Sequence, residues 1–155
     1  MEPAKILATL RYMSRDNARA PLRWRDGDSP GFSEVAPWIP YGNGAEAANV
    51  ESEERDPDSV LNFYKQCIAL RKGIDAFGRG DFERLPVADR ELFLYFKTRD
   101  KERLLIAANF SESCKQIEAS LDIDGIELLI SSYPERGNQF ELRPYEAKVF
   151  RLPRE

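Results

Sequence analysis

The sequence predicts an α+β fold in which two helices and a long irregular segment precede a small antiparallel β-sandwich. Helical spacing of apolar residues is confined to residues 1–73. After Gly80 the pattern changes to short apolar runs separated by charged turns, as expected for strands. No helix-length pattern lies between these runs, which argues against βαβ units and for antiparallel neighbours.

Two segments have the apolar spacing of helices. The first covers residues 4–13 and follows Pro3, a residue suited to the first helical turn. The second begins at Asp56-Pro57, an N-cap followed by a first-turn proline, and ends at Arg71-Lys72-Gly73. Its apolar positions are Val60, Leu61, Phe63, Tyr64, Cys67, Ile68 and Leu70.

Residues 14–54 lie between these helices and show no periodicity. Prolines and glycines punctuate this segment, which also contains the two tryptophans of the chain, Trp24 and Trp38. A structureless loop of this length is uncommon in a compact domain, and aromatic residues are not typical of a free linker. We therefore expect other parts of the protein to support this segment.

The second half of the chain contains six apolar runs that predict strands, with Gly78 and Gly80 marking their boundary with the helices. Charged connections at residues 98–103 and 122–125 predict hairpins between consecutive strands. The runs are residues 82–85, 92–96, 104–110, 117–121, 126–130 and 147–152.

Composition excludes several classes of function. The chain has 155 residues, a formal net charge of −4 and no histidine, so it cannot supply a Ser-His-Asp or Cys-His site or a histidine zinc ligand. No basic region favours nucleic acid or an anionic membrane as a partner. No apolar run approaches transmembrane length, and we expect no metal and no cofactor. Cys67 and Cys114 lie in apolar runs, which predicts reduced core residues in a cytoplasmic protein.

The polar cluster at residues 14–19 is a candidate sugar-binding site. Asp16, Asn17, Arg15 and Arg19 offer the paired donors and acceptors that pyranose hydroxyls require, and the indole of Trp24 could stack on a sugar ring. Taken alone, the cluster is better explained by a helix C-terminus with Asx turns and solvated ion pairs.

Two other patterns are better explained by structure than by chemistry. Glycoside hydrolysis needs two carboxylates, but the acidic run at residues 51–58 leads into a helix N-terminus, where the helix dipole favours negative charge. The aromatic residues Phe93, Tyr95 and Phe110 could form a carbohydrate-binding platform, yet alternating aromatics on strands favour core packing.

A series of motifs starts at Ser-Arg-Asp-Asn-Ala-Arg-Ala-Pro-Leu-Arg-Trp, residues 14–24, and continues over essentially the whole chain. The order of these motifs resembles that of glycoside hydrolase family 13 α-glucosidases, in the group of oligo-1,6-glucosidases, dextran glucosidases and trehalose-6-phosphate hydrolases. Ala20, Arg23 and Arg25 depart from the Thr, Gln and Asp usual in that group. Further matching motifs are Gly31-Phe32, Pro37 to Pro40, Asn49-Val50, Asp56 to Val60, Tyr64-Lys65, Ala69 to Lys72, residues 104–111 and Leu142 to Ala147.

The resemblance implies a C-terminal fragment of a retaining α-glucosidase. Residues 1–56 would be the tail of a catalytic (β/α)8 barrel with a substrate-side loop, residues 57–78 its closing helix and residues 79–155 a C-terminal antiparallel β-sandwich. Catalytic carboxylates would lie upstream, so this chain contains no catalytic residue of its own. The substrate-binding residues implied are Arg15, Asp16, Asn17 and Arg19, with Arg15 at the mouth of the site.

The partners implied are the missing upstream barrel and, in the intact enzyme, an oligosaccharide substrate. Without that barrel, the chain is expected to self-associate through the wide apolar surface of its second helix. Two alternatives remain at this stage: a complete, non-catalytic carbohydrate-binding module that uses Arg15, Trp24 and Trp38, or a purely structural β-sandwich domain.

Overall fold

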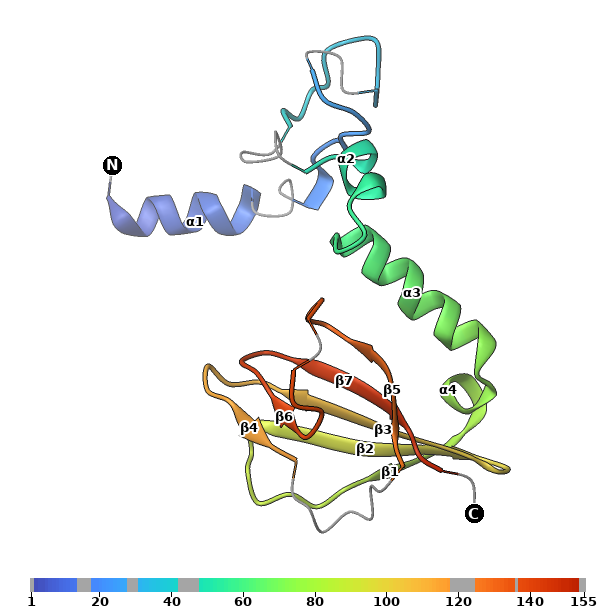
Figure 1. The fold of residues 1–155 in the computed structure, drawn as a ribbon. Helices are drawn as coiled ribbons and strands as arrows, with labels where there is room; N and C mark the ends of the chain where they lie inside the picture. Colours follow the sequence, from blue (N-terminus) through green and yellow to red (C-terminus); the bar gives the residue numbers. More distant parts are fainter. Residues whose placement is uncertain are drawn as a thin grey trace. The chain divides into compact units, whose positions relative to one another are not determined.

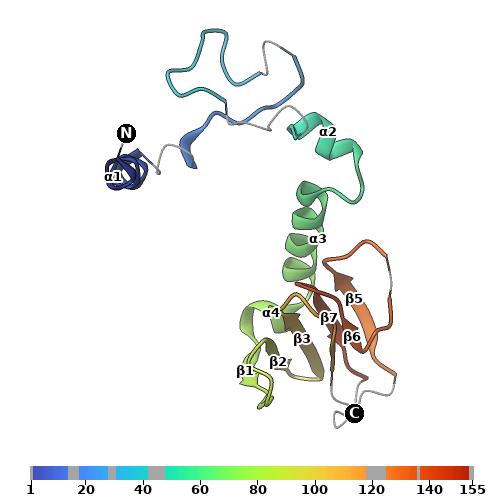
Figure 2. The ribbon, with the colours of Figure 1, turned by 90° about the vertical axis from the view of Figure 1, so that its left-hand side faces the viewer.

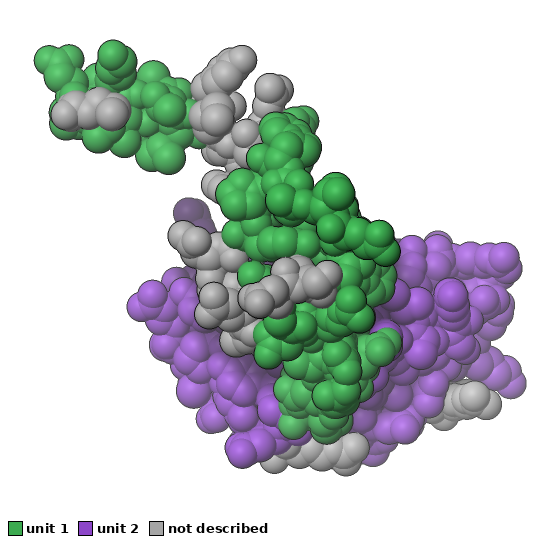
Figure 3. Space-filling view, turned by 90° about the horizontal axis from the view of Figure 1, so that it is seen from above, with its two compact units in different colours: residues 1–63 green, residues 64–155 purple. Residues whose placement is uncertain are grey.

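The structure, a computed structural model, divides into two compact units, residues 1–63 and residues 64–155 (Figure 3). It describes residues 2–13, 18–27, 31–41, 48–117, 125–135 and 137–153. Helices α1 to α4 come first along the chain and strands β1 to β7 follow, so the predicted α+β order is confirmed (Figure 1).

The first helix, α1 (Pro3–Met13), confirms the prediction and includes Pro3 as its first residue. Its apolar side chains Ile6, Leu7 and Leu10 are 42%, 57% and 57% exposed. Because these residues recur at helical spacing, they form one exposed apolar face.

The acidic run forms a helix of its own, α2 (Val50–Arg55), which the sequence analysis missed. A capping box begins this helix. The Asn49 side chain accepts a hydrogen bond from Ser52 N (2.9 Å), and Ser52 Oγ accepts one from Asn49 N (3.3 Å). Glu51 and Glu53 occupy the first turn, where the helix dipole favours their charge.

The predicted start of the second helix is wrong by several residues, because α3 covers Val60–Gly73. Asp56 instead forms a turn, with Oδ1 accepting a hydrogen bond from Asp58 N (2.9 Å). Ser59 performs the capping role, since its Oγ accepts from Asn62 N (3.2 Å) and its carbonyl from Phe63 N (2.9 Å). The Asp-Pro pair therefore marks the turn that separates α2 from α3.

Side chains of both helices fasten this turn. Glu53 Oε2 accepts a hydrogen bond from Leu61 N (2.9 Å) in the first turn of α3. Asn62 Nδ2 donates to the carbonyls of Glu53 (2.9 Å) and Asp56 (2.7 Å), and Ser59 Oγ donates to the Glu53 carbonyl (2.6 Å). These bonds satisfy groups at the end of one helix with groups at the start of the next.

The second unit is built on an antiparallel sheet of five strands in the order β1-β2-β3-β7-β5 (Figures 1 and 2). A separate antiparallel ladder joins β4 to β6. The strands are β1 (Asp81–Arg84), β2 (Leu92–Arg99), β3 (Glu102–Asn109), β4 (Lys115–Gln116), β5 (Glu127–Ser131), β6 (Glu141–Leu142) and β7 (Ala147–Arg151).

One predicted hairpin is confirmed and the other is wrong. The register places Arg99 opposite Glu102, so Asp100 and Lys101 form a two-residue turn, with Asp100 at φ 51°. In contrast, β4 and β5, which precede and follow residues 122–125, pair with β6 and β7 and not with each other. The predicted run at residues 117–121 also differs, because β4 ends at Gln116 and residues 118–121 lie outside the described part.

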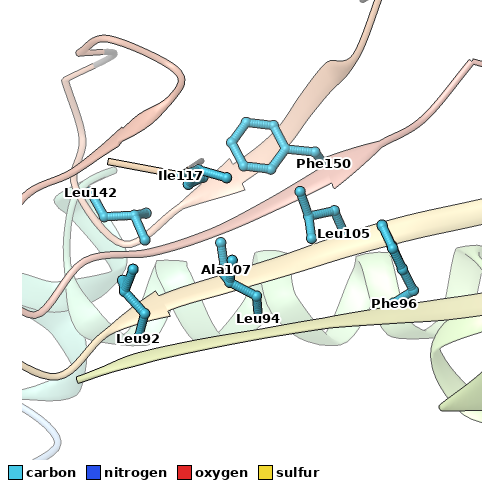
Figure 4. Close-up of a cluster of buried hydrophobic side chains, with 8 residues drawn as sticks. All are labelled: Leu92, Leu94, Phe96, Leu105, Ala107, Ile117, Leu142 and Phe150. Carbon is cyan, nitrogen blue, oxygen red and sulfur yellow. The ribbon is translucent and has the colours of Figure 1, made fainter. Parts of the chain in front are cut away.

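The main core lies on one face of the five-stranded sheet (Figure 4). Alternate residues of β2 point into it, as the period of a strand requires. Ile117, which follows β4, and Leu142 of β6 join the same cluster, so the small ladder covers this face. The buried members of the cluster are Leu92, Leu94, Phe96, Leu105, Ala107, Ile117, Leu142 and Phe150.

The predicted core role of the aromatic residues is wrong. Phe110 follows the end of β3 and is 67% exposed. Phe93 and Tyr95 alternate with the core residues of β2 and are half-buried on the opposite face of the sheet. The ring centroids of Phe93 and Tyr95 are 5.3 Å apart, and burial raises the pKa of the Tyr95 phenol.

That opposite face carries a second, smaller cluster beside α4 (Asp75–Arg79), a short helix that the sequence analysis missed. Ile74, Ala76 and Leu104 are its buried members. Gly78 lies within α4, while Gly80 marks its end. A Cβ at Gly80 would lie 2.5 Å from the Ala76 carbonyl oxygen, so this close approach requires glycine.

A buried ion pair joins β7 to the preceding turn. Lys148 and Glu146 side chains are 1% and 0% exposed, and Lys148 Nζ lies 3.4 Å from Glu146 Oε1. Glu146 accepts hydrogen bonds from Ser131 Oγ (2.8 Å) and Arg143 N (2.7 Å), and Lys148 Nζ donates to the Asn138 carbonyl (2.9 Å). Both charges are therefore compensated inside the fold.

The cysteines differ from their predicted core placement. Cys114 is exposed and Cys67 is half-buried, and both are free thiols. Burial raises the pKa of the Cys67 thiol, which favours its protonated form at neutral pH. Across the described ranges, no helix is long and apolar enough to cross a membrane, and no cluster of acidic or cysteine residues could hold a metal ion.

Candidate substrate-binding segment

Three of the four predicted substrate-binding residues, Arg15, Asp16 and Asn17, lie outside the residues that the structure describes. Arg19 is described: it forms a short 3-10 turn with Ala18 and its side chain is exposed. Two described segments adjoin the predicted cluster. Residues 18–27 directly follow it, and residues 31–41 contact residues 18–27.

Helix α2 anchors the end of the first segment. Val50 N donates to the Arg23 carbonyl (3.1 Å), and Glu51 N donates to the Trp24 carbonyl (3.0 Å). The first amides of a helix have no partner within the helix, so two consecutive loop carbonyls satisfy them here. These two bonds join the loop to the start of α2, which itself lies within residues 14–54. The expected support of this segment by other parts of the protein stays a prediction.

The two segments also contact each other through side chains. The Arg23 guanidinium carbon lies 4.9 Å from the centre of the Tyr41 ring, a cation–π arrangement. Arg23 Nε is buried and has no hydrogen-bond partner among the described residues. Gly31 packs on Trp24, since a Cβ at Gly31 (φ 86°) would lie 3.1 Å from Trp24 Cβ.

In the sequence, Arg23 stands out only as a departure from the family pattern, and no motif gives Tyr41 a role. No sequence signal could have paired them, because the partners are 18 positions apart in a segment without periodicity.

Both tryptophans have exposed indole surface. Trp24 is 50% exposed and Trp38 is 84% exposed. An indole combines an apolar face with one N–H donor, a combination suited to the C–H face and hydroxyls of a sugar. Each of these exposed indoles can stack on a ligand and donate one hydrogen bond.

The nearby acids of α2 are engaged in structural contacts. The Glu51 carboxylate pairs with Arg55, and Glu53 Oε2 accepts the Leu61 amide. Such roles differ from those of a glycosidase pair, in which both carboxylates face the scissile bond.

A small cavity in the second unit does not suit a sugar. It has a volume of about 220 Å³ and lies between α4 and the β2–β3 turn. Arg99 Nε lies 3.9 Å from Asp75 and 3.8 Å from Asp100, so charged groups of the lining face one another. Its lining residues are Asp75, Ala76, Arg99, Asp100, Lys101 and Glu102.

Comparison with known proteins gives one family. The model of the α-amylase catalytic domain matches residues 1–80. A probable oligo-1,6-glucosidase 2 of Bacillus subtilis is 35% identical over 97% of this chain, and the trehalose-6-phosphate hydrolase of the same organism is 34% identical over 98%. An oligo-1,6-glucosidase of Parageobacillus thermoglucosidasius is 33% identical over 97%. The chain spans 28% of the length of each of these relatives.

Solved structures agree with these relatives. A crystal structure of Bacillus licheniformis trehalose-6-phosphate hydrolase, in complex with PNG, has a TM-score of 0.83 and 32% identity. The match covers 99% of this chain and 29% of that one. An isomaltulose synthase from Klebsiella sp. LX3 has a TM-score of 0.79 and 32% identity, over 90% of this chain and 26% of that one.

Proposed function

The chain belongs to the α-amylase family, glycoside hydrolase family 13, and from this we propose that it is the C-terminal part of a retaining α-glucosidase. One observation carries the proposal: relatives named for the hydrolysis of glucosides match nearly all of this chain, while the chain spans only 28% of their length. The parent enzyme would hydrolyse short α-glucosides such as isomaltooligosaccharides.

We propose that residues 1–56 complete the catalytic barrel, that residues 57–78 form its closing helix and that residues 79–155 are a C-terminal β-sandwich. The end of the family match at residue 80 supports the second boundary. The core between the five-stranded sheet and the β4–β6 ladder supports the sandwich. The free thiols of Cys67 and Cys114 fit a cytoplasmic protein.

The parent would work by double displacement. One carboxylate attacks the anomeric carbon while a carboxylic acid protonates the leaving oxygen, and water then releases the covalent glucosyl enzyme with the second group acting as base. Both carboxylates would come from the part of the barrel outside this chain. Arg15, Asp16, Asn17 and Arg19 would bind and orient the substrate, with Arg15 at the mouth.

The first experiment tests whether the catalytic carboxylates lie outside this chain. The 155-residue chain, incubated at high concentration with 4-nitrophenyl α-glucoside, is expected to release no nitrophenol, because it lacks the pair of carboxylates. The full-length enzyme is the positive control, assayed with isomaltose and with trehalose 6-phosphate to identify the substrate class. Turnover by the short chain that survives repurification and disappears on mutation of one of its acids would contradict the proposal.

The second experiment tests Arg15 in the full-length enzyme. Arg15→Ala is expected to lower kcat/KM by about tenfold or more, the loss of a charge-assisted hydrogen bond of about 1.5 kcal/mol or more, with little change in Tm. Arg84→Ala, an exposed arginine of β1, is the control and should keep both values. Unchanged kinetics with a clear fall in Tm would assign Arg15 a structural role instead.

A further inference from the structure

Two segments of the first unit, residues 18–27 and residues 31–41, are joined at two points. At one point the Arg23 guanidinium stacks on Tyr41 at 4.9 Å, and at the other Gly31 packs against Trp24. Each segment carries one exposed indole: Trp24 directly follows Arg23, and Trp38 is three positions before Tyr41. A change at either joining residue can therefore reach the indole of the other segment.

The contact between Arg23 and Tyr41 has the features of a fixed contact. Arg23 is not free to move away as a whole, because its carbonyl accepts the Val50 amide of α2 at 3.1 Å. Its Nε is buried without a partner among the described residues, so the ring of Tyr41 supplies the attraction that compensates part of its lost hydration. A planar guanidinium stacks on a ring in a way that an amide or an ammonium does not reproduce.

We infer that Arg23 and Tyr41 are positioning residues whose contact holds these two segments together, a contact that we call the clasp. The clasp fixes the position in which the loop presents Trp24 and Arg19 to the substrate. The inference rests on the proposed α-glucosidase function for its kinetic consequence. The clasp itself depends only on contacts within residues 18–51.

The kinetic role is distinct from catalysis. Neither residue is required to touch the reacting atoms, so the chemical step should keep its rate once substrate is bound. When the contact is lost the loop is less well positioned, and the affinity for the substrate falls by the free energy that the contact contributed. The signature of a positioning residue is therefore a rise in KM with kcat nearly unchanged.

The first test uses the 155-residue chain. Trp24 and Trp38 are its only tryptophans, so a ¹H–¹⁵N spectrum contains two indole N–H signals, one from each segment. Arg23→Gln is expected to shift the Trp38 signal, and Tyr41→Leu the Trp24 signal. Tyr41→Phe keeps the ring, so both indole signals should stay at the positions they have in the unmodified chain. The matched control is Arg84→Gln, which removes a guanidinium 5.7 Å from the Phe93 ring in the other unit and should shift neither signal.

Effects confined to each variant's own segment would overturn the clasp. That outcome is a Trp38 signal unmoved by Arg23→Gln together with a Trp24 signal unmoved by Tyr41→Leu.

The second test uses the full-length enzyme and its best α-glucoside. Arg23→Gln and Tyr41→Leu are each expected to raise KM about two- to fivefold, the change that corresponds to about 0.5 to 1 kcal/mol, with kcat within about twofold. Because both variants remove the same contact, the double variant should raise KM no further than either single one. Additive effects, or an equal loss on Tyr41→Phe, would contradict the inference. A parent that hydrolyses no α-glucoside would refute the proposed function and leave the spectroscopic test of the clasp intact.

Discussion

Phe150 and Phe110 have identical side chains, but one is buried and the other is exposed. Phe150 of β7 is fully buried between β3 and β5, where its register partners are Leu105 and Leu128. Phe110 lies just beyond the end of β3 and is 67% exposed. The contrast follows from strand alternation at Phe150 and from the end of the strand at Phe110.

Truncation of these two residues should therefore have very different effects. Phe150→Ala is expected to lower the free energy of unfolding by about 3–5 kcal/mol through lost burial and the cavity left behind. Phe110→Ala, its matched control, should change that energy by no more than about 0.5 kcal/mol. Urea denaturation followed by circular dichroism measures both. Equal losses would mean that Phe110 is covered in solution.

Lys115 illustrates an ion pair whose effect depends on pH. Its ammonium lies 2.7 Å from both Asp89 and Glu91, and its hydrogen bond holds the pKa of the Asp89 carboxyl below the usual range. These carboxylates in turn raise the pKa of Lys115. A depressed carboxyl pKa gives stability that is present above the pKa of the unfolded chain and is lost as pH falls through the folded value. For Lys115 the sign is reversed, and its stabilising contribution is lost as pH rises through its raised pKa.

The interaction of Lys115 with Asp89 should consequently stabilise the protein at pH values between the lowered pKa of Asp89 and the raised pKa of Lys115. Asp89→Asn is expected to lower Tm at pH 7, and the difference from the unmodified chain should shrink as pH falls below about 4, where the unfolded carboxyl becomes protonated. Added salt should also shrink it, because the groups are near solvent. Thermal melts across pH and salt measure this. A Tm difference that stays constant down to pH 2 would exclude the pair as its source.

Among the elements, the junction of α2 and α3 depends most on polar contacts. One amide, Asn62, donates to carbonyls at the end of α2, and Glu53 accepts the Leu61 amide in return. Neither α2 nor α3 has a fully buried residue among those described, so burial contributes little to holding this junction.

Removal of the Asn62 amide should loosen the junction locally. Asn62→Ala is expected to cost about 1–2 kcal/mol and to speed hydrogen exchange of the α2 amides, while amides of β3 remain as protected as before. Glu34→Ala, at an exposed position of the loop, serves as the control. Faster exchange in β3 to the same degree would mean that the effect is global unfolding and not a local one.

Long elements could be predicted from the sequence and short ones could not. The eight-residue strands β2 and β3 each contain a continuous apolar run, Leu92 to Phe96 and Leu104 to Ala108, which is long enough to be recognised between charged turns. Helices α2 and α4 have six and five residues, and β4 and β6 two each, so no period can develop. Strand pairing was also beyond the sequence at β5, whose partner β7 is separated from it by β6.

The candidate site was predicted by motif and not by geometry. Arg19 and its neighbours were selected by resemblance, since residues 14–19 alone are compatible with ordinary turns. The bonds that join the segment to α2, from α2 amides to the Arg23 and Trp24 carbonyls, involve backbone groups and cannot be inferred from residue type. A sequence can indicate which side chains meet a ligand more readily than which amides support them.

At the scale of the whole molecule, exposed apolar surface is the main feature. On α3, Val60, Tyr64 and Ile68 recur every four residues and are 66%, 64% and 49% exposed. The apolar face of α1 is exposed as well. In the proposed parent, this surface would meet the rest of the catalytic barrel.

The isolated chain is therefore expected to self-associate with rising concentration and to bind a hydrophobic dye. The double variant Val60→Lys/Ile68→Lys should reduce both effects, because lysine keeps helix propensity and adds charge to the apolar row. Val35→Lys, at an exposed valine of the loop, should change neither effect. Light scattering across a concentration series measures association. A strict monomer without dye binding would show that the surface is covered in solution.

The buried ion pair of Glu146 and Lys148 restricts which substitutions the protein can accept at these two positions during evolution. Replacing either residue alone leaves the other charge buried without its ion-pair partner, at a cost of about 3–5 kcal/mol, which is a large part of the stability of a typical domain. Replacing both with apolar residues of similar size can be neutral. We therefore expect relatives either to keep both Glu146 and Lys148 or to replace both.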